Sequence, residues 1–182
     1  QQPTKSKAIL HKAYERSPEK VSPKSPKKYW WKCNQAEDHI WLASPAARSI
    51  SSGCPFCSHR RPSKAHNLAA VYPKLAAQWH YEKNGDLRPE NVLPKTERVV
   101  WWKCNKADDH VWQAKIHARA VRYNGDGLLC PFCRGCKVAI SNCLATTNPD
   151  LLDFWDYDKN TESPYKIYYG IHKKFWWKCH KG

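Results

Sequence analysis

The 182-residue chain contains no methionine, only 16 acidic residues and no long apolar run. A membrane-spanning helix needs about 20 consecutive apolar residues, so we expect no membrane association. Because methionine is missing even at position 1, we expect the sequence to begin after the natural start, with any targeting peptide removed or left out. The few acids face 31 lysines and arginines, which leaves a formal net charge of +15.

This charge excess is typical of proteins that bind a polyanion, and nucleic acid is the most common one. One alternative is that the charge serves solubility alone. An anionic membrane surface would call for a long amphipathic helix with a basic face, which the sequence lacks. We therefore expect a nucleic-acid partner and neither a membrane nor a small-molecule substrate.

The cysteine count argues against a secreted disulfide framework. There are nine cysteines, an odd number, beside nine histidines, and no apolar signal segment precedes them. Secreted small domains usually carry an even number of cysteines in disulfides, whereas cysteines with histidines in a reducing compartment favour metal binding. We expect an intracellular, reducing location.

A rare tetrapeptide, Trp-Trp-Lys-Cys, occurs three times, at Trp30–Cys33, Trp101–Cys104 and Trp176–Cys179. Recurrence at this spacing indicates tandem units of about 70 residues. Units this short seldom bury enough apolar surface to be stable without a metal or a neighbour. The expected organisation is an arm at residues 1–28, a first zinc module at 29–80, a second at 81–155 and an incomplete third repeat at 156–182, as if the sequence were part of a longer array.

The arm is rich in lysine, serine and proline and holds eight lysines and arginines against two glutamates. Such a segment cannot bury a core, so we expect it to be extended or disordered in isolation. It either lies along phosphates and orders on binding, or is a plain linker.

The first two repeats each contain a Cys-x5-His pair followed by Cys-Pro-Phe-Cys. Zinc takes four such ligands in tetrahedral geometry, and two short-range pairs brought together by a hairpin supply them. A lone Cys-x2-Cys could instead be a redox pair, but the duplicated histidine offset disfavours that interpretation. The two predicted Zn²⁺ sites are Cys33, His39, Cys54 and Cys57, and Cys104, His110, Cys130 and Cys133. With four protein ligands no position is left for a substrate or water, so both sites should be structural.

Three cysteines fall outside these sites. Cys136 and Cys143 have no counterpart in the first repeat and are interpreted as buried or free thiols, with a swapped ligand or an iron–sulfur cluster as the alternative. Cys179 matches Cys33 and Cys104 and would belong to an unfinished site.

Short strands and helices should surround the zinc ligands. Apolar and polar residues alternate over Trp112–His117, which predicts a half-buried strand. Pro45 should either shorten the corresponding strand of the first repeat or place it at a sheet edge. Helical segments are expected near 68–79, with Pro73 starting a new helix, and from Pro149 after a cap at Asn148.

The ten tryptophans divide into two kinds. Trp41, Trp112, Trp79 and Trp155 are expected in small cores, although stacking on unpaired bases is an alternative. Adjacent strand residues face opposite ways, so one tryptophan of each doubled pair should pack inside. The other should face outward and cover either the next repeat or a base.

Taken together, the Trp-Trp-Lys-Cys, His-x-Trp, Gly-Cys-Pro-Phe-Cys and Lys-Asn motifs over residues 30–182 resemble a family of tandem zinc-ribbon or treble-clef repeats. The resemblance implies a small α+β fold of tandem zinc-stabilised modules, built from short β-hairpins and short helices, that binds nucleic acid without its own catalysis. Such arrays also resemble zinc proteins of divergent mitochondrial ribosomes, which implies a mitochondrial matrix location.

We therefore expect a non-catalytic, RNA-binding structural protein of a large ribonucleoprotein such as a mitochondrial ribosome, where it would also contact neighbouring proteins. RNA is favoured over DNA because no long recognition helix suits a major groove. The alternative is a DNA-binding accessory array of a nuclease. The candidate phosphate contacts are Lys24, Lys27, Lys28, Arg48, Arg60, Arg61, Lys64, Lys103, Lys115, Arg119, Arg122 and Arg134.

Overall fold

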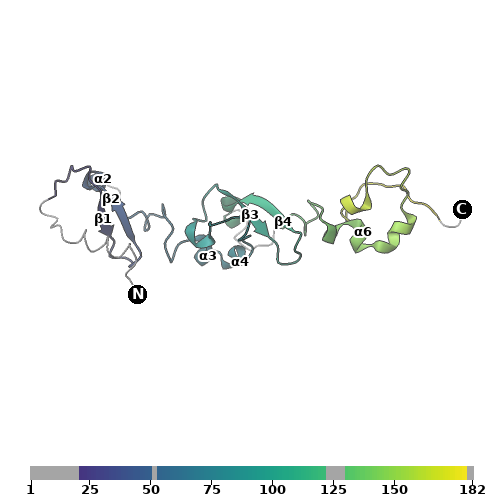
Figure 1. Ribbon diagram of the computed structural model, residues 1–182, viewed down its shortest axis with the longest axis horizontal. Helices are drawn as coiled ribbons and strands as arrows, with labels where there is room; N and C mark the ends of the chain where they lie inside the picture. Colours follow the sequence, from purple (N-terminus) through teal and green to yellow (C-terminus); the bar gives the residue numbers. More distant parts are fainter. Residues whose placement is uncertain (1–20, 51–52, 122–129, 180–182) are drawn as a thin grey trace. The chain divides into compact units, whose positions relative to one another are not determined.

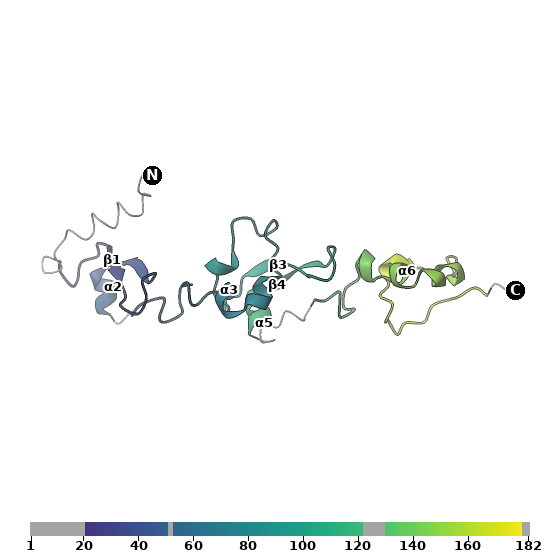
Figure 2. The ribbon, with the colours of Figure 1, turned by 90° about the horizontal axis from the view of Figure 1, so that it is seen from below.

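The computed structural model describes residues 21–50, 53–121 and 130–179. The chain divides into two compact units, residues 1–70 with 90–93 and residues 71–89 with 94–182. Figures 1 and 2 show that the elements within them are short hairpins and helices of only a few residues. No helix among the described residues is both long enough and apolar enough to cross a membrane.

The first unit contains one β-hairpin followed by a short helix. Strand β1 (Tyr29–Lys32) pairs antiparallel with β2 (Ile40–Ala43), and Trp31 lies opposite Trp41. Ser44 then caps helix α2 (Pro45–Ser49) by accepting a hydrogen bond from the Ala47 N–H. Pro45 takes the first helical position, where its missing N–H costs nothing. The prediction that Pro45 shortens the strand is confirmed, and the physical reason is that the proline begins a helix.

The second unit repeats this hairpin with longer strands. Strand β3 (Val99–Lys103) pairs with β4 (Val111–Lys115), and Trp102 lies opposite Trp112. The predicted alternation ends at Lys115, because helix α5 (Ile116–Ala120) begins at the next residue. The expectation of a strand continuing through His117 is therefore wrong. Ile116, the first residue of α5, is fully buried. Its burial matches the position of the next apolar residue in the strand pattern, although the residue belongs to the helix.

A short helical segment precedes each later Trp-Trp-Lys-Cys. The first is formed by α3 (Leu68–Val71) and α4 (Pro73–Ala76), and Pro73 begins the second helix as predicted. The other contains α6 (Leu144–Thr147) and a 3-10 helix, η4 (Pro149–Phe154), preceded by Asn148. Further 3-10 helices in the described part of the chain are η2 (Pro89–Asn91), η3 (Ile140–Asn142) and η5 (Pro164–Lys166).

The segment that leads from each of these helices to the next Trp-Trp-Lys-Cys, the lead-in segment, is hydrogen-bonded to the tryptophan pair that follows it. The Asn84 side chain donates to the Trp101 carbonyl (2.8 Å) and accepts from the Trp101 N–H (2.8 Å). Asn160 makes the same two bonds to Trp176, at 2.7 and 2.9 Å. The asparagine of the Lys-Asn motif thus forms a two-bond clamp on the backbone of the first tryptophan of the pair.

The indole rings complete this attachment. Trp79 packs edge-on against Trp102, with ring centroids 5.5 Å apart, and Trp155 packs edge-on against Trp177 at 5.2 Å. Residues 71–89 consequently belong to the same compact unit as β3 and β4. The boundary expected at residue 80 does not coincide with this division, because Trp79 completes the core of the hairpin that follows it.

Candidate metal centres

The turn of each hairpin carries the first two ligands. Cys33 follows β1 and His39 precedes β2, and the hairpin closes with a hydrogen bond from the Cys33 N–H to the His39 carbonyl (3.0 Å). Cys104 and His110 repeat this bond at 3.0 Å. A five-residue turn therefore presents one thiol and one imidazole to the same point.

The Cys-Pro-Phe-Cys segment forms a tight turn that carries the other two ligands. In the first unit the Pro55 carbonyl accepts from the N–H groups of Arg60 (2.8 Å) and Arg61 (3.0 Å). In the second unit the Pro131 carbonyl accepts from the N–H groups of Cys136 and Lys137, again at 2.8 and 3.0 Å. Both turns have the same hydrogen-bonded frame although the residues that follow differ.

This turn needs a left-handed residue two positions after its second cysteine. Gly135 has φ +70° there, and His59 has φ +52° at the equivalent place. Glycine adopts this region without steric cost, whereas a side chain is disfavoured. An added Cβ at Gly135 would also overlap the ring of Tyr168.

The four predicted ligand atoms of each set converge. All four lie within 4.8 Å of one another in both Cys33–His39–Cys54–Cys57 and Cys104–His110–Cys130–Cys133. In the first set the Cys33 and Cys57 sulfurs are 3.6 Å apart, and His39 Nδ1 lies 3.7 and 3.4 Å from the sulfurs of Cys54 and Cys57. In the second set the corresponding distances are 3.7, 3.6 and 3.5 Å.

These spacings fit tetrahedral zinc. With Zn–S bonds of about 2.3 Å and Zn–N bonds of about 2.0 Å, tetrahedral angles place two sulfurs about 3.8 Å apart and a sulfur about 3.5 Å from a nitrogen. Each site would bind the metal through histidine Nδ1, which is the ring nitrogen facing the sulfurs.

The chemistry of the thiols also calls for a cation. Burial, together with hydrogen bonds that its own thiol donates to Cys130 and Cys104, raises the pKa of Cys133 to about 12. Causes of the same kind raise the pKa of Cys57 to about 11. Three thiols this close cannot all ionise without a compensating positive charge, and a divalent metal supplies it.

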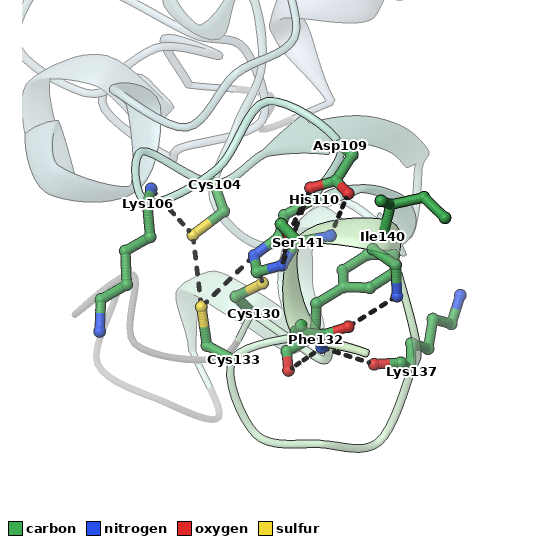
Figure 3. Close-up of polar contacts among 12 residues, drawn as sticks. Cys104, Lys106, Asp109, His110, Cys130, Phe132, Cys133, Lys137, Ile140 and Ser141 are labelled. Atoms are coloured by element: carbon green, nitrogen blue, oxygen red, sulfur yellow. Dashed lines mark hydrogen bonds and ion pairs between the residues drawn. The ribbon is translucent and has the colours of Figure 1, made fainter. Parts of the chain in front are cut away.

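A hydrogen-bond relay orients the second histidine (Figure 3). The Ser141 hydroxyl lies 3.0 Å from His110 Nε2, the nitrogen that faces away from the sulfurs, and donates to Asp109 Oδ1 at 2.6 Å. The Ser141 N–H donates to the other Asp109 oxygen at 2.9 Å. Desolvation raises the pKa of Asp109, but the hydrogen bonds that Ser141 donates outweigh this effect. The pKa of Asp109 therefore lies below its usual value. Partners of this kind fix the tautomer of a ligating histidine.

The first site has part of this arrangement. Asp38 also precedes its histidine ligand, and its carboxylate accepts from the Lys64 N–H at 2.6 Å, which lowers the pKa of Asp38. In both units the aspartate therefore ties the hairpin turn to the segment after the cysteine turn.

A stack of aromatic rings connects each histidine ligand to the hairpin core. Phe132 stacks on His110, with centroids 4.9 Å apart, and meets the edge of Trp112 at 6.4 Å. The Arg119 guanidinium then lies 4.9 Å from the Trp112 ring and 4.4 Å from the Trp102 ring.

The first unit repeats every contact of this stack. Phe56 stacks on His39 at 5.1 Å and meets Trp41 at 6.4 Å. Arg48 lies 5.2 Å from the Trp41 ring and 5.0 Å from the Trp31 ring. The histidine, phenylalanine, tryptophan and arginine positions of the repeat thus form one packed column beside the metal.

Comparison with known families agrees with this geometry. A family described as "Probable Treble clef zinc finger domain" matches the chain twice, over residues 11–60 and 75–136. The chain belongs to this treble clef zinc finger family. No curated protein matches the chain.

The two matches and the two ligand groups together establish a tandem pair of treble clef modules with two structural Zn²⁺ sites. The predicted fold, short hairpins and short helices around Cys₃His sites, is confirmed. In each treble clef the four ligands lie in two tight turns, and neither turn contains a strand or a helix. The metal therefore cross-links the hairpin turn to the cysteine turn, in addition to the aspartate and aromatic contacts between them.

The structure sorts the predicted phosphate contacts into three groups. Lys103 pairs with Asp108 at 2.6 Å and Lys115 with Glu97 at 3.0 Å. Arg48 and Arg119 belong to the aromatic columns, and Arg119 is only 5% exposed. Arg122 lies outside the described residues. The others are exposed: Lys24, Lys27, Lys28, Arg60, Arg61, Lys64 and Arg134.

The buried position of Arg119 corrects its predicted role. Its guanidinium donates to the Gln78 side chain at 2.7 Å and lies against two indole rings, so it is part of the core and not of a phosphate-binding surface. Burial lowers the pKa of Arg119 to about 10, which still leaves it charged at neutral pH. The signal that could have revealed this role is positional, because Arg48 and Arg119 both follow the His-x-Trp tryptophan by seven residues.

The extra cysteines join neither group of four. Cys143 is fully buried and its thiol donates to the Ile140 carbonyl at 3.2 Å, in keeping with a buried structural thiol. Cys136 and Cys179 are exposed. The Asn84 and Asn160 clamps and the Ser141 relay were not predicted from the sequence, although the repeated Lys-Asn dipeptide marks both clamps.

Proposed function

We propose that this treble clef protein is a non-catalytic RNA-binding protein, in which zinc stabilises each module and exposed cations bind phosphates. It would be a structural component of a large ribonucleoprotein such as a mitochondrial ribosome, in the mitochondrial matrix. Four protein ligands around each metal leave no coordination position for a reacting water, which supports a structural role.

The observation that carries the proposal is the distribution of positive charge. Three thiolates outweigh one divalent cation by one charge, so two metallated sites lower the formal charge only from +15 to +13. In the first unit, the described residues 21–50 and 53–70 contain eight lysines and arginines against Glu37 and Asp38. Arg48 packs against the Trp31 and Trp41 rings, and none of the other seven pairs with a carboxylate among the described residues. Arg60, Arg61 and Lys64 are exposed beside the cysteine turn.

RNA is favoured over DNA by the size of the elements. The longest helices that the structure describes have five or six residues, as in α5 and η4. Reading a major groove with a helix usually takes a longer one. Small modules with exposed cations fit the irregular surface of a folded RNA.

Binding of the zinc-loaded chain to a structured RNA and to duplex DNA over a salt series tests the proposal. We expect tighter binding to the RNA, with an affinity that falls steeply as salt rises. Arg61→Ala should reduce the slope of log K against log salt by about one. Lys115→Ala removes the same charge from a lysine already paired with Glu97, so it should change the slope less. Tighter binding to duplex DNA at every salt concentration would favour a DNA-processing array, and binding to neither would refute the proposal.

A further inference from the structure

The first tryptophan of each Trp-Trp-Lys-Cys projects outward, and Trp30 and Trp101 do so from strands β1 and β3. Trp30 is 40% exposed and Trp176 is 61% exposed, whereas Trp102, the second tryptophan of the middle copy, is fully buried. Alternation along the strand explains this division in β1 and β3, whereas Trp176 lies outside the described strands. The three outward rings differ in what covers them.

In the second and third copies the outward ring already has a cation over it. The Lys83 ammonium lies 4.3 Å from the Trp101 ring centroid, and Lys159 lies 5.0 Å from that of Trp176. The lysine that follows each pair is also engaged. Lys103 pairs with Asp108, and Lys178 pairs with Asp158 at 2.7 Å.

The first copy has neither arrangement among the residues that the structure describes. Within that part of the chain no lysine or arginine lies over Trp30, and no carboxylate pairs with Lys32. Lys28, Trp30 and Lys32 are all exposed and alternate with the more buried Tyr29 and Trp31. Trp30 and Lys32 therefore share one face of β1, and Lys28, the residue directly before the strand, continues the alternation.

The strand opposite extends this face with an apolar side chain. Leu42 of β2 is the direct partner of Trp30 and is 42% exposed. Directly opposed residues in an antiparallel pair project to the same side. An indole with a leucine beside it and a lysine on either side along the strand is thus presented to solvent.

We propose that this face binds an unpaired base of single-stranded RNA, with the base stacked on Trp30 and the flanking phosphates contacted by Lys28 and Lys32. The two lysines are four residues apart, which is about 13 Å along a strand, so each can reach the phosphate on its own side of the stacked nucleotide. Aromatic stacking combined with cationic contacts to the backbone is the general mode of single-strand recognition. The inference rests on the proposed RNA-binding function and assigns it a site.

A protein ligand is the less suitable occupant of this face. Among the described residues, the charged side chains of this face are Lys28 and Lys32, both cationic, and the adjoining segment adds Lys24 and Lys27. This combination complements a polyanion with exposed aromatic bases better than an apolar protein surface.

Binding of a fluorescein-labelled uridine decamer to the full zinc-loaded chain tests the site. We expect Trp30→Ala to weaken binding about 5- to 100-fold with no change in salt slope, because it removes stacking and not charge. Trp30→Phe should retain most of the affinity. Lys32→Ala should reduce the salt slope by about 0.7, the value for one contact on a single strand.

Trp176→Ala is the matched control, since it removes an even more exposed indole that already has a lysine over it. It should change the affinity less than twofold. Zinc content and circular dichroism of each variant confirm that the modules remain folded. If the wild-type chain binds RNA and Trp30→Ala binds equally well, or if both tryptophan variants lose affinity equally, the proposed site is wrong while the proposed function stands. If the wild-type chain binds no RNA of any kind, both are refuted.

Discussion

At the scale of single residues, the aromatic column explains why the repeat keeps the same side chains beside each metal. His110 is held between the zinc position and Phe132, and Phe132 in turn contacts Trp112. Arg119 fills the space between Trp112 and Trp102 with a flat, charged group that can face both rings. A lysine could not do this, because its ammonium is compact and strongly hydrated.

The column gives a direct prediction for Arg119. Arg119→Ala should lower the free energy of unfolding by about 2–3 kcal/mol, since it removes two cation–π contacts and the hydrogen bond to Gln78. Urea denaturation of the zinc-loaded chain measures this change. Arg119→Lys should also be destabilising, whereas Arg134→Ala, at an exposed position, should alter stability by less than about 0.5 kcal/mol. Unchanged stability with weaker RNA binding would restore Arg119 to the phosphate contacts.

The ligands were predictable at this scale and the column was not. Cys33 and His39 lie within one turn, and Cys54 and Cys57 within another, so their spacing alone reveals both pairs. Arg119 acts on Trp102 across a hairpin and a helix start, and nothing in the local sequence states that contact. The sequence alone does not show whether an arginine is exposed or buried.

At the scale of elements, the decisive feature is the turn made by Cys-Pro-Phe-Cys. Its frame of hydrogen bonds to the proline carbonyl is the same in both units. The left-handed residue that the frame requires is histidine in one unit and glycine in the other. His59 shows that the turn imposes this conformation even on a residue with a side chain.

Gly135→Ala should therefore destabilise the second unit by at least about 2 kcal/mol. Alanine disfavours the left-handed region by about 1–2 kcal/mol, and its Cβ would displace the Tyr168 ring. Gly53→Ala is the matched control, because nothing lies within 4 Å of a Cβ at that position. Thermal unfolding of the two variants compares them. A Gly135→Ala variant as stable as Gly53→Ala would show that neither φ nor Tyr168 constrains the turn.

The hairpins were predictable as elements, but their limits and attachments were not. Alternation identified β4 correctly, yet it continued two residues too far, because a buried Ile116 can end a strand or begin a helix equally well. The clamp of Asn84 on Trp101 joins residues 17 apart in sequence. Only the three-dimensional structure shows that the lead-in helix belongs with the hairpin that follows it.

At the scale of the whole molecule, two compact units each contain one complete ligand group. Neither described unit has more than short strands and helices of up to six residues, so the metal sites supply the stability that a larger core would otherwise provide. Because each ligand group lies within one unit, we expect each site to bind its zinc independently, and removing one ligand should affect one site.

Native mass spectrometry of the folded chain tests this claim most directly. We expect two zinc ions in the wild-type protein, and one in each of the matched variants Cys57→Ser and Cys133→Ser, which each remove one ligand. Chelation of both ions should abolish the folded charge-state distribution. One zinc or none in the wild-type chain, or a folded distribution that survives complete chelation, would contradict the account.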